Sequence, residues 1–295
     1  MRKGRKDLLK YLTINDDDER WGIVCTTVGY QTVLPGADYP VLRHPDKYNF
    51  KFQGRILNEY QLVYIVEGRG YFASESCRKV RVTAGTMIQL FPGEWHTYKP
   101  DKDTGWVEYW VGFRGVNIDN RVKEGFFSKD CPVRRIGISD TIMGLYDRIL
   151  RYAEEEKSGY QQLISSIVLH LLGLVYYKDQ NCSYTDGVLV DKLNKARSIM
   201  RETVDTPVSL EEIAREVGMG YSWFRRVFKQ YTGMSPVKYQ MQQRLARAKE
   251  LLGNTAMTVT EVAYTLGFTT VSQFSVFFKK MEGMTASEFK ERFSR

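Results

Sequence analysis

The sequence predicts an α+β protein in which an N-terminal antiparallel β-barrel and a helical hairpin precede an all-α domain of two helix-turn-helix units joined by a long helix. Three observations predict it. Short runs rich in β-branched and aromatic residues extend to about residue 118, and helical spacing replaces them from about residue 139. A sequence pattern occurs twice in the C-terminal part of the chain: FKQYTGMSPVKY at Phe228–Tyr239 resembles FKKMEGMTASEF at Phe278–Phe289.

Residues 21–138 form the predicted barrel. The runs QLVYIVEG, YFAS, KVRVTAG, TMIQLFPG and WVEYWVGF are separated by Gly, Pro, Asp and Asn at roughly ten-residue intervals, a spacing typical of a sandwich or barrel. The basic residues before them lead to no apolar run of the kind that a secretory signal contains. We therefore expect residues 1–20 to be an N-terminal arm.

Residues 139–180 carry apolar side chains at helical spacing in two segments, which predicts a helical hairpin. The hairpin has more apolar surface than a lone pair of helices can bury, so we expect it to cover a domain or a second subunit and to serve dimerisation. Its longest apolar run is too short and too mixed to span a bilayer, and we expect a cytoplasmic protein with no membrane partner. Residues 181–189 look like a linker.

Charge is unevenly distributed along the chain. From Val190 onward there are 17 Lys and Arg against 11 Asp and Glu, whereas the first 189 residues hold 26 against 24. A basic C-terminal third on a nearly neutral body favours a polyanionic partner for that third, although a solvated surface would look the same. The four cysteines are far apart, which favours reduced thiols over disulfides: Cys25, Cys77, Cys131 and Cys182.

The repeat begins well before the quoted phrase. Ser209–Glu212 opens one copy and Thr258–Glu261 the other, and both fit a capping box. In each copy a short helix ends near a glycine and a second helix follows, which is the helix-turn-helix arrangement. Between the copies, Ser235–Leu252 predicts one long helix with proline in its first turn, which would hold the two units apart. A helical solenoid is the alternative, but two unequal copies fit it poorly.

The order and spacing of SLEEIAREVGM, FRRVFKQYTGMSPVKY, RLARAKELL, VTEVAYTLGF and FKKMEGMTASEF resemble the AraC/XylS family of bacterial transcription regulators. The resemblance covers residues 190–295. It implies a regulator, in most cases an activator, and not an enzyme. The partners it implies are double-stranded promoter DNA, a small-molecule effector, RNA polymerase and a second copy of the chain. No cofactor is expected.

In the first copy the family's base-reading positions fall on Ser222, Arg225 and Arg226, and arginine can donate two bonds to guanine. Trp223 is implied to contact the DNA backbone or a thymine methyl. Phe224 and Phe228 are expected to face the core.

In the second copy the matching positions are Ser272, Gln273 and Val276. Family members usually carry arginine where this chain has Val276, so we expect the first copy to dominate specificity. Gln273 is implied to read adenine, and Lys279 and Lys280 to hold phosphates. Three cations on the connecting helix are equally compatible with a solvated face and with phosphate contact: Arg244, Arg247 and Lys249.

The runs LVYIVEGRGYF, AGTMIQLFPGEWH and WVEYWVGF resemble the cupin-like sensor domain of the same family. Alternation along the last run places Trp106, Glu108 and Trp110 on one face of a strand. Two aromatic rings beside a carboxylate suit a sugar, so the expected effector is a mono- or oligosaccharide. Comparison with arabinose-responsive members adds Tyr98 to the implied ligand site, and Arg43 with a poorer alignment.

Other readings of the barrel remain open. A metal-dependent cupin needs several histidines at one ion, and only His96 lies in the barrel motif, so no metal is expected. A metal-free cupin enzyme or carrier with an attached DNA-binding domain is one alternative. A ligand-blind regulator with a filled barrel is the other, and it would need a buried partner for Glu108, such as Arg55 or Arg69.

Overall fold

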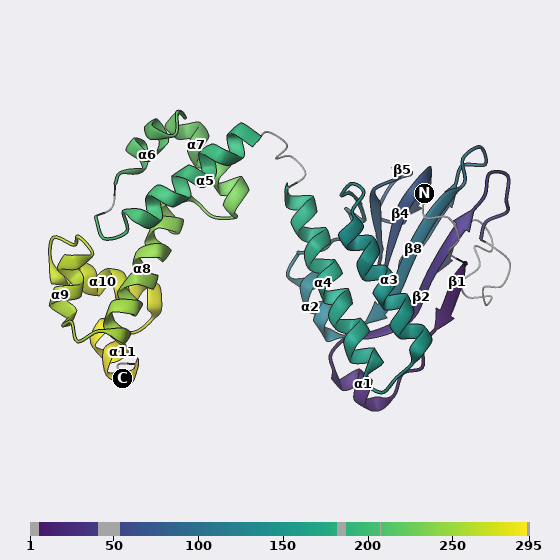
Figure 1. Cartoon of the computed structure of the whole chain (residues 1–295), viewed down its shortest axis with the longest axis horizontal. Helices are drawn as coiled ribbons and strands as arrows, with labels where there is room; N and C mark the ends of the chain where they lie inside the picture. Colours follow the sequence, from purple (N-terminus) through teal and green to yellow (C-terminus); the bar gives the residue numbers. More distant parts are fainter. Residues whose placement is uncertain (1–5, 41–53, 182–186, 207, 294–295) are drawn as a thin grey trace. The chain divides into compact units, whose positions relative to one another are not determined.

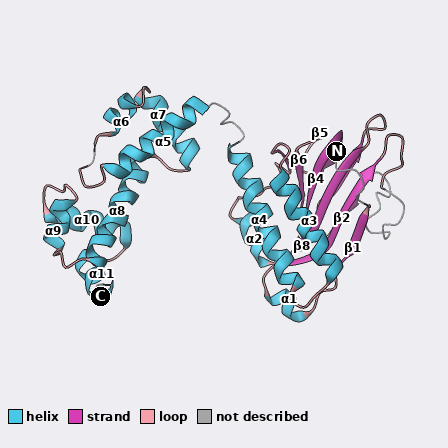
Figure 2. Cartoon of the chain, in the orientation of Figure 1, coloured by secondary structure: helices cyan, strands magenta, loops and turns pink. Residues whose placement is uncertain are grey.

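The computed structural model describes residues 6–40, 54–181, 187–206 and 208–293. The chain divides into two units, residues 1–182 and 183–295. Strands occur in the first unit, and the described part of the second is helical, which confirms the predicted α+β class (Figure 2). Among the helices in the described ranges, none is long and apolar enough to cross a membrane.

The described part of the first unit contains nine strands, and every pairing is antiparallel. Their order is β1-β2-β8-β4-β6-β9, while β5 and β7 pair with β4 and β3 pairs with β7. The strands are β1 (Leu8–Tyr11), β2 (Val24–Val33), β3 (Arg55–Ile56), β4 (Tyr60–Ser74), β5 (Val80–Thr83), β6 (Thr86–Leu90), β7 (Trp95–Pro100), β8 (Trp106–Arg114) and β9 (Val133–Arg135).

The long strand β4 belongs to both halves of the barrel. Its first part pairs with β6 and β8, and its second part, from Arg69, pairs with β5 and β7. The change of partners comes just after a register shift between Ile65 and Glu67. Gly68 lies there with φ of +81°, and a Cβ would meet the Gly105 carbonyl oxygen at 2.1 Å, so only glycine fits. This bend lets one strand enclose the interior from two sides.

Alternation along the strands separates two cores. On β8, Trp106 and Trp110 belong to the inner core of the barrel, whereas Tyr109, Val111 and Phe113 belong to the outer core between the sheet and the helices. The sequence placed the two tryptophans on one face, and the structure confirms that arrangement.

Two long helices, α3 (Asp140–Glu155) and α4 (Tyr160–Asn181), lie against the outer face of the sheet (Figure 1). Two shorter helices complete this unit, α1 (Asp16–Arg20) and α2 (Val116–Lys123). The Tyr146 hydroxyl donates to the Leu62 carbonyl at 3.0 Å, and Gln161 Nε2 donates to the Cys25 carbonyl at 3.0 Å. The sheet is thus the domain partner that the apolar hairpin required.

Residues 6–20 do not form a separate arm. Strand β1 pairs with β2 at the edge of the sheet, and Leu8 packs against the outer core while Leu9 packs against the inner one. Asn15 then caps α1 in a reciprocal capping box with Asp18. The predicted boundary at residue 20 therefore differs from the structure, because a four-residue edge strand in a charged segment is too short to leave a clear pattern.

The second unit consists of two helix-turn-helix copies around a long connecting helix (Figure 1). The connecting helix packs against helices of both copies. The helices are α5 (Gly187–Glu202), α6 (Leu210–Glu216), α7 (Tyr221–Thr232), α8 (Pro236–Asn254), α9 (Val259–Thr265), α10 (Val271–Glu282) and α11 (Ala286–Phe293). Of the predicted linker 181–189, residue 181 belongs to α4 and residues 187–189 belong to α5, which differs from the prediction, and residues 182–186 lie outside the described residues.

Local chemistry explains why the two copies share one shape. Ser209 and Thr258 each cap a helix in a reciprocal box with the glutamate three residues on, as the sequence predicts. Gly233 and Gly283 end α7 and α10 in the left-handed conformation. Each copy also has its own aromatic core, centred on a pair of buried phenylalanines: Phe224 and Phe228 in the first, Phe274 and Phe278 in the second.

Candidate ligand pocket and nucleic-acid interface

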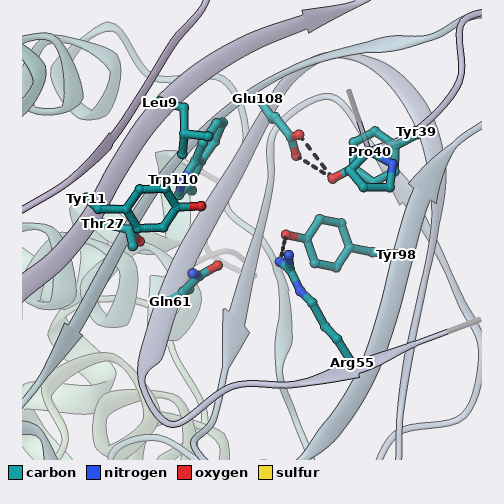
Figure 3. Close-up of a pocket in the computed structure, with 10 residues that line it drawn as sticks. All are labelled: Leu9, Tyr11, Thr27, Tyr39, Pro40, Arg55, Gln61, Tyr98, Glu108 and Trp110. Atoms are coloured by element: carbon teal, nitrogen blue, oxygen red, sulfur yellow. Dashed lines mark hydrogen bonds between the residues drawn. The ribbon is translucent and has the colours of Figure 1, made fainter. Parts of the chain in front are cut away.

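A pocket opens in the barrel interior between side chains of six strands and the Tyr39–Pro40 segment (Figure 3). Its free space is about 20 Å³, which is room for about one water molecule. Carboxyl, amide, hydroxyl and guanidinium groups reach this space beside one tryptophan ring. The lining residues are Leu9, Tyr11, Thr27, Tyr39, Pro40, Arg55, Gln61, Tyr98, Glu108 and Trp110.

Glu108 on β8 is 3% exposed and is bonded inside the protein. The Tyr39 hydroxyl donates to its Oε1 at 3.1 Å (Figure 3). Gln31 Nε2 donates to the same oxygen at 3.4 Å. Burial raises the pKa of Glu108 to about 7, although hydrogen bonding from Tyr39 and the positive charge of Arg55 act to lower it. Near neutral pH the carboxyl group is thus available both as a hydrogen-bond donor and as an acceptor.

Arg55 on β3 is held by two side chains of β7. Its Nη2 donates to the Tyr98 hydroxyl at 2.7 Å, and its Nε donates to His96 Nε2 at 3.3 Å. His96 Nδ1 lies 3.1 Å from the Glu94 carbonyl, which places the ring proton on Nδ1. Burial lowers the pKa of His96 to about 3, and the charge of Arg55 acts in the same direction. His96 is therefore a neutral acceptor that orients Arg55.

The histidines are not gathered at one point. His170 is exposed on α4, His96 is buried beside Arg55, and His44 lies outside the described residues. Within the described residues, no group of three or more His, Cys, Asp or Glu side chains could hold a metal ion. The donors around the pocket are hydroxyl, amide, carboxyl and guanidinium groups, which suit hydrogen bonding to a polar organic molecule.

The two tryptophans of β8 have different roles. Trp110 lines the pocket and packs against Gly29 of β2, where an added Cβ would come within 2.0 Å of the indole. Trp106 packs behind the pocket wall, with its ring centroid 5.6 Å from that of Tyr39 and 6.1 Å from that of Tyr98. Glycine at position 29 thus makes room for the Trp110 indole, and Trp106 packs against two tyrosines of the pocket wall.

The pocket brings together three members of the ligand site implied by the sequence, Tyr98, Glu108 and Trp110. Trp106 is only a neighbour of the wall, and Arg43 lies outside the described residues. Of the two arginines considered as partners of Glu108, Arg55 lines the pocket. Arg69 is on the surface, where it pairs with Asp101 and Asp103.

Several lining residues were missed in the sequence. One of them left a signal, because Gln61 is a polar residue at an inward position of the otherwise apolar run QLVYI, and it is 2% exposed. Five others come from segments far apart in the chain whose side chains meet only after folding: Leu9, Tyr11, Thr27, Tyr39 and Pro40. Arg55 was predicted only as a partner of Glu108.

The second helix of the first copy, α7, presents a polar face and buries an aromatic one. Its exposed side chains include all four residues implied to bind DNA: Ser222, Trp223, Arg225 and Arg226. Phe224 and Phe228 are fully buried, as predicted. The helix thereby holds its cations and Trp223 away from the core, where a polyanion can reach them.

Helix α10 of the second copy presents a different face. Its exposed side chains include Ser272, Gln273, Lys279 and Lys280, together with Val276, which is 67% exposed. With an offset of 50 residues, Val276 corresponds to Arg226, whereas Gln273 corresponds to Trp223 and not to Arg225. The Thr270 hydroxyl caps the helix by accepting a hydrogen bond from the backbone N–H of Gln273.

Three cations of the connecting helix α8 have partners inside the second unit. Arg244 Nη2 donates to the Leu266 carbonyl at 2.5 Å and its guanidinium lies 4.0 Å from the Phe268 ring centroid. Arg247 pairs with acidic side chains, and Lys249 Nζ lies 2.6 Å from a carboxylate oxygen of Glu282. These contacts give the three side chains partners within the second unit, beside the two alternatives that the sequence left open.

Comparison with known proteins assigns both units. Residues 39–172 match the sequence profile of the AraC-like ligand binding domain, and residues 213–292 match the profile of a helix-turn-helix domain. These two stretches coincide with most of the barrel and hairpin and with most of the two helix-turn-helix copies.

Relatives match over most of the chain. The MmsAB operon regulatory protein of Pseudomonas aeruginosa is 26% identical over 80% of this chain and 76% of its own length. The raffinose operon transcriptional regulatory protein of Pediococcus pentosaceus is 22% identical over 82% of this chain and 89% of its own. A solved AraC-type transcriptional regulator from Chromobacterium violaceum is 31% identical over 36% of this chain and 96% of its own, with a TM-score of 0.34.

Proposed function

The chain belongs to the AraC family of DNA-binding transcription regulators, and we propose that it responds to a sugar or oligosaccharide held in the barrel of its first unit. The observation that carries this proposal is Glu108, a buried carboxyl that shares with Trp110 a cavity edged by hydroxyl and amide groups. The regulatory protein of a raffinose operon among the relatives supports the same class of effector.

The pocket offers the two kinds of contact that a sugar needs. The indole of Trp110 can cover the apolar C–H face of a pyranose ring, while Glu108 accepts from a hydroxyl that would otherwise lose its hydrogen bonds on burial. Arg55, Gln61 and Thr27 line the same space and can bond further hydroxyl groups. A ligand with many hydroxyl groups and one apolar face matches this combination.

Tyr39 occupies part of the space that a sugar would use. Its hydroxyl already donates to Glu108, and its ring packs against Trp106 and Tyr98. A sugar hydroxyl would replace the Tyr39 hydroxyl on the same carboxyl oxygen, so one hydrogen bond is exchanged for another. Ligand binding would thereby shift an equilibrium between positions of the Tyr39 segment.

The small cavity also favours a second candidate function, a regulator whose barrel binds nothing. A space of about 20 Å³ does not admit a sugar unless Tyr39 moves, and Tyr39 and Gln31 already bond Glu108. In this alternative the polar groups stabilise the barrel, and the regulator is controlled by its abundance or by a protein partner. The two candidates differ in whether Tyr39 can be displaced.

We propose that the exposed residues of α7 and α10 contact promoter DNA, with α7 supplying the stronger contacts through Arg225 and Arg226. We further propose that two copies associate through the exposed side of α4, which carries Leu163 and Tyr177 outside the outer core. We also propose that the chain activates transcription through RNA polymerase. Sedimentation of the chain with and without promoter DNA tests the association.

Thermal melting of the full chain with a panel of mono- and oligosaccharides tests the sugar proposal. Tryptophan fluorescence reports the first unit, because four of the five tryptophans lie there. A sugar at about one hundred times its Kd should stabilise that unit by about 2.7 kcal/mol. The shift should be lost in Glu108→Ala and enlarged in Tyr39→Phe, where the competing hydroxyl is removed. No shift with any sugar, in either the native chain or Tyr39→Phe, would favour the ligand-blind barrel.

A further inference from the structure

Val276 is an unusual residue to find on the surface of α10. At 67% it has the highest exposed fraction among the large apolar side chains that the structure describes. It also borders a largely apolar groove of about 370 Å³ between α10 and α8. The groove is lined by Met241, Ser272, Gln273, Val276, Phe277, Lys280 and Met281.

A lone exposed valine is ordinary on a protein surface, so its position has to carry the argument. Val276 follows Gln273 by three residues and Ser272 by four, which puts all three on one side of the helix. Lys279 and Lys280 continue that side by one more turn, and both are exposed. The valine thus lies within a polar, cationic face that belongs to the second helix of a helix-turn-helix copy.

The chemistry of the side chain limits what it can read. Valine neither donates nor accepts a hydrogen bond, so it cannot select guanine, cytosine or adenine by their polar edges. In the major groove of ordinary DNA, the apolar feature that distinguishes one base is the C5 methyl group of thymine. The corresponding residue of the first copy, Arg226, has the opposite chemistry and suits guanine.

We propose that Val276 determines specificity by packing against a thymine methyl, next to an adenine bound by Gln273. Residues three apart are separated by about 4.5 Å along the helix, and successive bases of one strand by about 3.4 Å, so the two side chains can address neighbouring base pairs. The second copy would then read an A·T-rich step without a charged base contact. This inference rests on the proposed DNA interface.

The experiment uses a duplex selected from a random library by the full chain, so no promoter needs to be known. Each thymine in the duplex is replaced singly by deoxyuridine, which removes the methyl and keeps the base pair. Burial of one methyl group corresponds to about fourfold in affinity. We expect one position to weaken binding by about that factor, and we expect Val276→Ala to abolish the difference between thymine and deoxyuridine there. The dependence of affinity on salt should not change in Val276→Ala, because no phosphate contact is lost.

Val237→Ala is the matched control, since Val237 is an exposed valine on α8 rather than on α10. It should leave the deoxyuridine effect intact. The inference is overturned if the selected duplexes fix no A·T pair in the part read by the second copy. It is also overturned if no deoxyuridine position depends on Val276. A chain that selects no sequence at all would instead refute the proposed DNA interface, so the two failures are distinguishable.

Discussion

The two candidate sites differ in where they keep their charged side chains. In the barrel, Arg55, His96 and Glu108 are 9%, 1% and 3% exposed, and each has hydrogen-bond partners within the first unit. On α7, Arg225 and Arg226 lie on the exposed face, whereas Phe224, Val227 and Phe228 are buried. The same kinds of side chain are thus enclosed in one unit and presented to solvent in the other.

This difference determines which property of the protein a substitution at each site will alter. A buried charge is stabilised only by its partners, so a substitution in the barrel alters folding and ligand binding together. An exposed charge contributes little to folding, so a substitution on α7 can alter DNA binding alone. Substitutions in the barrel and on α7 test this comparison. Those in the barrel should have the larger effects on the free energy of unfolding.

The largest effect is expected for Arg55→Ala. It removes the donor to Tyr98 and His96 and leaves buried polar groups unsatisfied, which should cost about 3 kcal/mol or more in the free energy of unfolding. Urea denaturation followed by tryptophan fluorescence measures it. Arg69→Ala is the matched control, because this surface arginine has ion pairs in solvent, and its midpoint should hardly move. Equal losses in the two variants would contradict the comparison.

Glu108→Gln should change the pH dependence of stability. The folded pKa of Glu108 is about 7 and the ordinary value is 4.5, so the folded chain binds the proton more tightly and stability falls as pH rises between these values. The ionised form should cost on the order of 3 kcal/mol above pH 7, and the amide avoids that cost. Unfolding free energies of both chains should therefore agree near pH 4.5 and diverge by pH 7.5.

His96 supplies an internal check on this pH effect. Its folded pKa of about 3 lies below the ordinary value of 6.5, so its contribution to stability rises with pH over that interval, opposite in sign to that of Glu108. Because His96 is unchanged in Glu108→Gln, its contribution should cancel in the difference between the two chains. A difference that does not vary with pH would mean that Glu108 is not buried as the structure has it.

The smallest effect on folding is expected for Arg225→Ala. It should weaken binding to a selected duplex by about 1–3 kcal/mol and relax the base preference at one position, with the unfolding midpoint unchanged. Fluorescence anisotropy with single-base variants of the duplex measures both. Arg244→Ala is the matched control, since this half-buried arginine bonds the Leu266 carbonyl and should lower stability without relaxing any base preference. A uniform loss across all duplexes would make Arg225 a phosphate contact.

The sequence alone determined the second unit in most of its detail. The capping boxes at Ser209 and Thr258, the glycine ends at Gly233 and Gly283, and the proline in the first turn of α8 are interactions within four residues of the chain. Interactions this local can be predicted from the order of the residues alone. Their repetition in the sequence indicated that the same structure occurs twice. The alternation of side chains along β8 could be predicted for the same reason, because it depends only on the two-residue period of a strand.

The tertiary structure decided the pocket. Tyr39, Arg55 and Glu108 come from segments far apart in the chain, and no local pattern states that their side chains meet. Burial is likewise a property of the folded unit, and burial moves the pKa values of Glu108 and His96 in opposite directions. The edge strand β1 contributes Leu9 and Tyr11 for the same reason, since its place in the sheet is fixed by pairing with β2 and not by its own four residues.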